Sequence, residues 1–171
     1  MQNDYIFQTV KTDEEMNELE NLAYEIWQEY WTPRISKEQT DYMIRKFQSF
    51  DALKKQIQNE NHIYKILKSD NSNAAYFGIC IKQTPKPYLF LSKLYVKSEF
   101  RFKGLGKVLF EEIKDISKRK NLKKIQLTIN KYNSETLEKY KKWGFRITDS
   151  VITDIGGGFV MDDYVMEYDL N

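Results

Sequence analysis

The feature that most constrains this fold is the stretch from Tyr88 to Lys118, where a strand pattern changes to a helix pattern across a short turn. Apolar and aromatic residues run from Leu89 to Val96, which predicts a β-strand. After Gly104 and Gly106 the apolar residues recur at helical spacing. The first turn of such a helix has N–H groups with no partner inside the helix, and the glycines allow a bulky anion to approach them. This turn is therefore a candidate pyrophosphate-binding loop.

Two common phosphate loops do not match this turn. A P-loop needs a glycine where Arg101 stands and a Ser or Thr where Val108 stands. A dinucleotide fingerprint needs Gly or Ala at Leu109 and a place on the first strand of a βαβ unit. The pattern that is present is Arg101-x-x-Gly104-x-Gly106. An ordinary helix start with a basic first turn also fits this segment when it is taken alone.

A second segment, from Ile125 to Phe145, reads as a strand followed by a short helix. Asn133 follows the strand, Tyr140 lies seven residues later, and Gly144 with Phe145 ends the segment. Together the two segments resemble the two signatures of the GNAT superfamily of N-acetyltransferases. The resemblance is closest to the bacterial spermine/spermidine (diamine) acetyltransferase-like members.

The resemblance implies an α/β fold, an α+β arrangement with a mixed sheet, of the GNAT acyl-CoA N-acyltransferase type. The hydrophobic patterns predict the order β-α-α-α-β-β-β-α-β-α-β-β in one domain that spans residues 1–171. This order agrees with the GNAT arrangement along the whole chain.

The boundaries of the expected elements follow from caps and alternation. Thr12 opens a capping box that predicts a helix to about Tyr30. Ser36 to Gln39 form a second capping box that opens a second helix, and Asp51 is expected to cap a third. Strands are expected at residues 4–10, 62–68, 74–83, 89–96, 146–155 and 159–170, and from Ile125.

The resemblance also implies that acetyl-CoA is the co-substrate and indicates which residues bind it. The main chain of Leu94, Tyr95 and Val96 would pair with the pantetheine arm. The pyrophosphate would be held by the turn, which comprises Arg101, Phe102, Lys103, Gly104, Leu105, Gly106 and Lys107. Phe102 stands where the family often has glycine, so the turn must either avoid a positive φ there or tolerate its cost.

The resemblance assigns two side chains to the chemistry. Tyr140 would protonate the leaving thiolate as the general acid and would also contact the cofactor, although it also fits a core aromatic position. Asn133 would hydrogen-bond the cofactor arm, and it also suits a helix N-cap. The general base is not identified, because the central strand offers only Ser92 and Lys93, with Glu99 beyond its end.

For the acceptor, the resemblance points to the first helices and to the loop between the last two strands. Aromatic faces there can attract a cationic amine, although each also fits a plain core position: Trp27, Tyr30, Trp31 and Tyr42. Met161-Asp-Asp-Tyr164 adds two carboxylates. A small polyamine-like amine is favoured, while a protein amine, an antibiotic, or a non-catalytic acyl-CoA sensor of the same fold are the alternatives.

Composition narrows the remaining classes. Cys80 is the only cysteine and His62 the only histidine, so no metal site and no intrachain disulfide are expected. A net charge of +2 does not favour nucleic acid as a partner, although basic residues cluster from Lys114 to Lys124. With no long apolar run, we expect a cytoplasmic protein without membrane contact, and a homodimer is left open.

Overall fold

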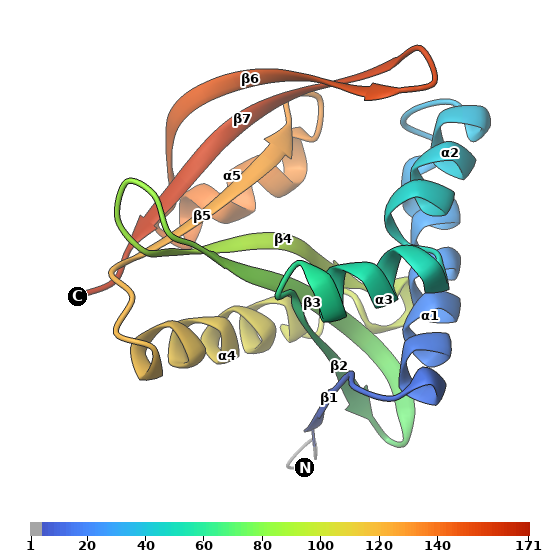
Figure 1. Cartoon of the computed structure of the whole chain (residues 1–171), viewed down its shortest axis with the longest axis horizontal. Helices are drawn as coiled ribbons and strands as arrows, with labels where there is room; N and C mark the ends of the chain where they lie inside the picture. The colour runs from blue at the N-terminus through green and yellow to red at the C-terminus, as the bar shows by residue number, and fades with distance from the viewer. Residues whose placement is uncertain (1–4) are drawn as a thin grey trace. The chain divides into compact units, whose positions relative to one another are not determined.

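The computed structural model describes residues 5–171, and its elements follow the expected order (Figure 1). The elements are β1 (Tyr5–Thr9), α1 (Asp13–Trp31), α2 (Lys37–Phe47), α3 (Phe50–Asn59), β2 (Ile63–Ser69), β3 (Ser72–Lys82), β4 (Tyr88–Val96), α4 (Leu105–Arg119), β5 (Lys124–Asn130), α5 (Ser134–Lys142), β6 (Arg146–Gly156) and β7 (Phe159–Asp169). The seven strands form one mixed sheet in the order β1-β2-β3-β4-β5-β7-β6. The predicted α/β class and element order are confirmed.

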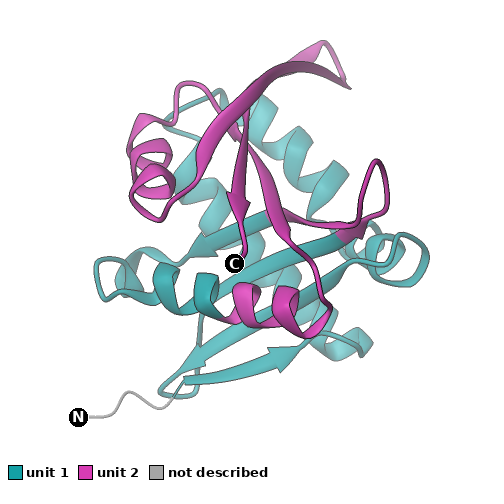
Figure 2. Cartoon of the chain, turned by 90° about the vertical axis from the view of Figure 1, so that its left-hand side faces the viewer, with its two compact units in different colours: residues 1–80, 93–111 teal, residues 81–92, 112–171 magenta. Residues whose placement is uncertain are grey.

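The chain divides into two compact units that exchange segments (Figure 2). Unit 1 comprises residues 1–80 and 93–111, and unit 2 comprises residues 81–92 and 112–171. The strands β3 and β4 and the helix α4 each have residues in both units. The sequence predicts one domain over residues 1–171.

Unit 1 holds three helices and the β1-β2-β3 ladders. In the antiparallel β1–β2 ladder Phe7 pairs with Leu67, and the β2–β3 hairpin continues from Ser69 to Ser72. The hairpin turn is shorter than expected, because Asp70 and Asn71 both adopt positive φ. That conformation allows a two-residue turn, which aspartate and asparagine favour.

The helix starts test the capping predictions. Thr12 accepts the Glu15 N–H at 3.2 Å while the Glu15 carboxylate accepts the Thr12 N–H at 2.9 Å, so the capping box is confirmed. The Ser36 hydroxyl caps α2 through the Gln39 N–H at 3.0 Å, which is one half of the expected second capping box. The prediction that Asp51 caps α3 is wrong, because Ser49 accepts the Ala52 N–H and Asp51 lies in the first turn.

Unit 2 is built on β5 and β7. The β5–β7 ladder is antiparallel and uninterrupted from Lys124–Asp169 to Asn130–Asp163, and β6 pairs with the other edge of β7. Phe145 joins α5 to this sheet, since its ring lies 5.3 Å from Tyr140 and 5.4 Å from Tyr168. One face of β5 and β7 is therefore covered by α5 (Figure 1).

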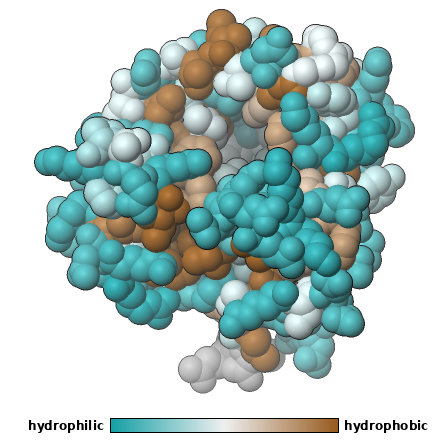
Figure 3. Space-filling model, in the orientation of Figure 1, coloured by the Kyte–Doolittle hydropathy of each residue, from teal (hydrophilic) through white to brown (hydrophobic). Residues whose placement is uncertain are grey.

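The edge strand β6 is exposed along most of its length. Its apolar side chains include Ile147, Val151 and Ile152, the last of which is 69% exposed. The space-filling view shows apolar atoms over β6 at the top (Figure 3). The closely packed part of unit 2 is instead the α5-covered face, where Met166 is fully buried.

Candidate functional site

The turn before α4 is held by Arg101. Strand β4 ends at Val96, a short 3-10 turn spans Ser98–Phe100, and α4 starts at Leu105. The Arg101 side chain donates from Nε to the Val96 carbonyl oxygen at 3.0 Å, and its guanidinium lies 5.5 Å from the Tyr30 ring centroid. Arg101 thus ties the turn to the end of the strand.

Of the two glycines of this turn, one is exposed to solvent and the other is half-buried. Gly104 is exposed with φ +81°, and a Cβ built on it would meet no atom within 4 Å. Gly106 is half-buried inside the first turn of α4. Phe102 tolerates φ +61° rather than avoiding it, and its ring is 95% exposed. A bulky anion can therefore approach this main chain.

The first turn of α4 supplies the hydrogen-bond donors. The N–H groups of Lys107 and Val108 donate to the Gly104 carbonyl at 3.0 and 3.3 Å. For Leu105 and Gly106 no such main-chain acceptor exists among residues 5–171. Helix N-termini with unpaired N–H groups attract anions. Arg101, Lys103 and Lys107 add positive charge around them.

Tyr95, near the end of β4, forms an aromatic cluster with three rings of α1, and we define the cluster as Trp27, Tyr30, Trp31 and Tyr95. The Tyr95 ring lies 5.4 Å from Trp27 and 6.3 Å from Tyr30, and its hydroxyl accepts the Trp31 indole N–H at 3.3 Å. Since side chains alternate along a strand, Leu94 and Val96 point to the other face.

The structure brings together three of the four expected acceptor residues in this cluster. Trp27 is buried and donates its indole N–H to the Tyr76 hydroxyl at 2.9 Å, so it is part of the core. The Tyr30 ring is covered by the Arg34 guanidinium at 3.9 Å. Tyr42 lies on α2, where the Lys46 ammonium is 5.7 Å from its ring centroid.

Lys93 belongs to a buried polar network on the same face of β4 as Tyr95. Its ammonium donates to the Tyr64 hydroxyl at 2.6 Å, and Tyr64 donates to the Gln56 side-chain oxygen at 2.5 Å. Burial lowers the pKa of Lys93 to about 8. Sequence reasoning noted the lysine but not this network, because its partners come from α3 and β2.

In unit 2, the residues after α5 fix the position of Tyr140. The Phe145 N–H donates to the Tyr140 carbonyl and the Gly144 N–H to the Lys141 carbonyl, both at 3.0 Å. These two bonds form a Schellman motif, which requires the left-handed backbone that Gly144 adopts at φ +102°. The Gly-Phe pair thus has a local reason: it ends the helix that carries Tyr140.

Asn133 and Tyr140 are both nearly buried, at 9% and 8% exposure. Asn133 occupies the N-cap position of α5, but its side chain makes no capping hydrogen bond to the helix. The Tyr140 ring packs edge-on against Trp143 at 5.5 Å and against Phe145 at 5.3 Å. The Asn133 side chain is therefore not used as a helix cap.

Sequence reasoning did not distinguish the two carboxylates that follow the β6–β7 turn. Asp162 is half-buried and pairs with Lys131 at 2.6 Å. Asp163 is only 4% exposed, and burial, followed by the charge of Asp162, raises its pKa to about 6. The available signal in the sequence was that the two acids are neighbours in a strand after the triple glycine. Neighbouring strand residues face opposite ways, so the two side chains lie in different surroundings.

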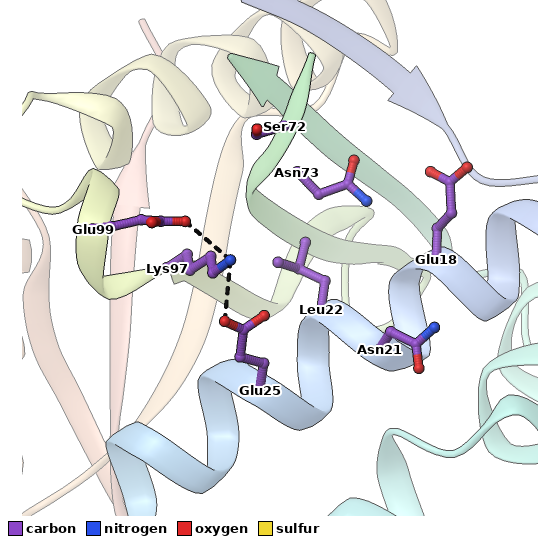
Figure 4. Close-up of a pocket in the computed structure, with 8 residues that line it drawn as sticks. All are labelled: Glu18, Asn21, Leu22, Glu25, Ser72, Asn73, Lys97 and Glu99. Carbon is purple, nitrogen blue, oxygen red and sulfur yellow. Dashed lines mark ion pairs between the residues drawn. The ribbon is translucent and has the colours of Figure 1, made fainter. Parts of the chain in front are cut away.

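A separate pocket in unit 1 is lined by α1, the start of β3 and the segment after β4 (Figure 4). It measures about 340 Å³ and contains three carboxylates. Lys97 lies 3.0 Å from both Glu25 and Glu99, and Lys68 lies 3.1 Å from Glu18. Two lysines thus pair with the three acids, and Lys97 is shared between Glu25 and Glu99.

Residues 5–171 contain no group of three His, Cys, Asp or Glu side chains placed to hold a metal ion. Over the same residues, no helix has the length and apolar character needed to cross a bilayer.

Comparison with known proteins gives consistent results. The model of the acetyltransferase (GNAT) family matches residues 18–145. A spermidine N(1)-acetyltransferase of Thermoplasma acidophilum is 25% identical over 150 residues, covering 87% of this chain and 91% of that protein.

Two solved structures have the same fold. One is the PaiA N-acetyltransferase of T. acidophilum in complex with coenzyme A, with a TM-score of 0.80 at 23% identity, covering 98% of this chain and 99% of that one. The other is a GCN5-related N-acetyltransferase from Rhodopseudomonas palustris, with a TM-score of 0.78 at 11% identity and 99% coverage of both chains.

Proposed function

Because this chain belongs to the acetyltransferase (GNAT) family, whose model matches residues 18–145, we propose that it acetylates a primary amine of a polyamine-like acceptor. Family membership makes the chain an N-acetyltransferase with acetyl-CoA as the acetyl donor. The proposal concerns the acceptor and the roles of individual residues.

The observation that carries the donor site is the open glycine turn at the start of α4. The exposed Gly104, the N–H groups of Leu105 and Gly106, and three basic side chains suit the pyrophosphate of the carrier. The main chain of Leu94 to Val96 would pair with the pantetheine arm, and Asn133 would bind the same arm. Phe102 adds no contact with its exposed ring.

The polyamine acceptor is supported by two observations. The T. acidophilum relative is described as a spermidine N(1)-acetyltransferase. In this chain, the aromatic cluster already holds cations, since the guanidinium groups of Arg34 and Arg101 lie at the Tyr30 ring. Aromatic faces that bind arginine can also bind an alkylammonium group.

The reaction needs an aligned amine and a protonated leaving group. The acceptor nitrogen attacks the thioester carbonyl carbon, so that the C–N bond forms and the C–S bond breaks. Tyr140, held by the Schellman motif, would give its phenolic proton to the departing thiolate. No covalent bond to the protein is required.

A thiol-release screen tests the acceptor class. Purified protein with acetyl-CoA is offered spermidine, single amino acids, an aminoglycoside and an N-terminal peptide. We expect spermidine to give the highest kcat/KM. Tight CoA binding with no thiol release for any amine would instead favour a non-catalytic acyl-CoA sensor.

Replacing Tyr140 tests the general acid. We expect Tyr140→Phe to lower kcat about 100-fold, as is typical for loss of a general acid, with the KM for acetyl-CoA changed only a few-fold. The matched control is Tyr132→Phe, because Tyr132 lies in the same unit and is 88% exposed. Equal kcat values for Tyr140→Phe and wild type would remove Tyr140 from the chemistry.

A further inference from the structure

The Tyr30 ring, near the C-terminal end of α1, has a guanidinium group stacked on its face. The central carbon of the Arg34 guanidinium lies 3.9 Å from the Tyr30 ring centroid, well within the range of a cation–π contact. Arg34 comes from the short loop that joins α1 to α2 (Figure 1). A cation site on this ring is therefore occupied by a side chain of the protein itself.

Two arginines lie at the Tyr30 ring, and they are held in different ways. The Arg101 guanidinium is 5.5 Å from the ring centroid, and its Nε donates to the Val96 carbonyl at 3.0 Å, which ties this half-buried side chain to the end of β4. Arg34 is exposed, so water can replace its hydrogen bonds when the side chain turns away from the ring. Arg34 is thus the guanidinium that an incoming cation can displace.

Arg34 also has a structural task at the end of α1. The last carbonyls of a helix have no partner inside the helix, and cations are favoured beside them. The last turn of α1 contains no basic residue, and Arg34 donates from Nη1 to the Tyr30 carbonyl at 2.6 Å. This capping bond needs a donor but not a charge. The capping bond and the contact with the ring can therefore be separated by substitution with a neutral amide.

The charge that a polyamine brings to an aromatic face is not on its attacking nitrogen. That nitrogen must be neutral when it attacks the thioester. The other nitrogens stay protonated at pH 7, because alkylamines have pKa values near that of lysine, about 10. A remote ammonium and the Arg34 guanidinium cannot share one face of Tyr30, and their like charges repel each other. Binding of one therefore requires that the other leaves.

We propose that Arg34 is a specificity-determining residue, because its guanidinium occupies the place on the Tyr30 ring that the remote ammonium of a polyamine takes. This role rests on the proposed function. A polyamine must displace Arg34 and so loses part of the attraction of the ring, whereas a monoamine has no second charge and leaves Arg34 in place. Arg34 therefore reduces the preference of the enzyme for polyamines over monoamines.

The test is Arg34→Gln, which removes the charge and retains an amide donor for the Tyr30 carbonyl. The matched control is Arg45→Gln, which removes the same charge from an exposed position on α2. Thiol release from acetyl-CoA is measured with spermidine and with butylamine, and the melting temperature is recorded for each variant. We expect Arg34→Gln to lower the KM for spermidine about two- to fivefold, the scale of one exposed cation–π contact. The kcat for spermidine and both constants for butylamine should be unchanged, as they should be for Arg45→Gln.

A double-mutant cycle places the effect on the ring. Tyr30→Leu removes the aromatic face and should raise the KM for spermidine. In that background Arg34→Gln should bring no further gain, because the two side chains act through the same contact. Tyr30→Phe keeps the aromatic face, so the gain from Arg34→Gln should persist in it.

The outcomes separate the two claims. A wild type that acetylates spermidine, with an unchanged KM in Arg34→Gln, would overturn the role of Arg34 alone. A gain that persists in Tyr30→Leu would also overturn it, and so would a lower melting temperature with no change in KM, which would leave Arg34 as a helix cap. A wild type that releases no thiol with spermidine would overturn the polyamine acceptor and the role of Arg34 with it.

Discussion

At the scale of the residue, burial of the Lys93 ammonium costs free energy of folding. Its ammonium faces a tyrosine hydroxyl and an amide oxygen, and no described carboxylate forms an ion pair with it. Burial therefore lowers the pKa of Lys93 from 10.5 to about 8. A lysine whose charged form is disfavoured by folding destabilises the folded state wherever it must remain protonated.

The pH dependence of this cost has a definite sign. Between about pH 8 and pH 10.5 the unfolded chain retains the Lys93 proton while the folded chain has lost it. The unfolded state then binds more protons, so the free energy of unfolding rises with pH in this window. Below pH 8 both states are protonated and the full cost is present.

We therefore expect Lys93→Met to stabilise the protein at pH 7 by roughly 1–3 kcal/mol, allowing for the lost hydrogen bond to Tyr64. The gain should shrink as the pH rises toward 10.5. Urea unfolding at several pH values measures it, with Lys86→Met at an exposed loop position as the control. A stability difference that does not vary with pH would show that Lys93 keeps its proton in the fold.

At the scale of the element, a comparison of two glycines can separate the effect of backbone strain from the effect of ligand contact at the turn before α4. Gly104 and Gly158 have nearly the same φ, +81° and +80°, and an added Cβ would meet no atom within 4 Å at either position. Only Gly104 lies at a helix N-terminus, whereas Gly158 lies in the turn between β6 and β7. The two positions therefore form a matched pair.

We expect Gly104→Ala and Gly158→Ala each to lower stability by about 1 kcal/mol, because alanine is strained at positive φ. Only Gly104→Ala should weaken CoA binding, by about tenfold or more, since its methyl group enters the approach to the unpaired N–H groups. Calorimetry with CoA measures the affinities. Equal affinities for the two variants would exclude the turn as the pyrophosphate site.

Helix caps and short glycine motifs could be predicted from the sequence, whereas contacts between distant elements could not. Thr12 and Ser36 were correctly placed because an N-cap depends on residues three positions apart. The prediction that Asp51 caps α3 was wrong because Ser49, two residues earlier, is also a good N-cap. The Ser49 hydroxyl accepts the Ala52 N–H, and the helix starts there. The glycine turn and the Gly144-Phe145 pair were recognised from short patterns. Asp163 and the Lys93 network were not, because burial and partners from distant elements decide them.

At the scale of the whole molecule, carrier binding should stabilise the fold through mass action. A ligand at 100 times its Kd adds about 2.7 kcal/mol if it binds only the folded state. For a chain of 171 residues this corresponds to several degrees in the melting temperature. We expect CoA to produce such a shift and adenosine, which lacks the phosphates, to produce almost none. A melting temperature indifferent to CoA would contradict the carrier site.

The Schellman motif at the end of α5 also determines how this helix can change in evolution. The position of Tyr140 is fixed relative to Gly144, because the Tyr140 carbonyl accepts the Phe145 N–H that ends the helix. An extra residue near Ser134 would leave the phenol where it is and turn Asn133 by about 100° around the helix axis. Insertions in α5 should therefore uncouple the two signature side chains without moving the hydroxyl.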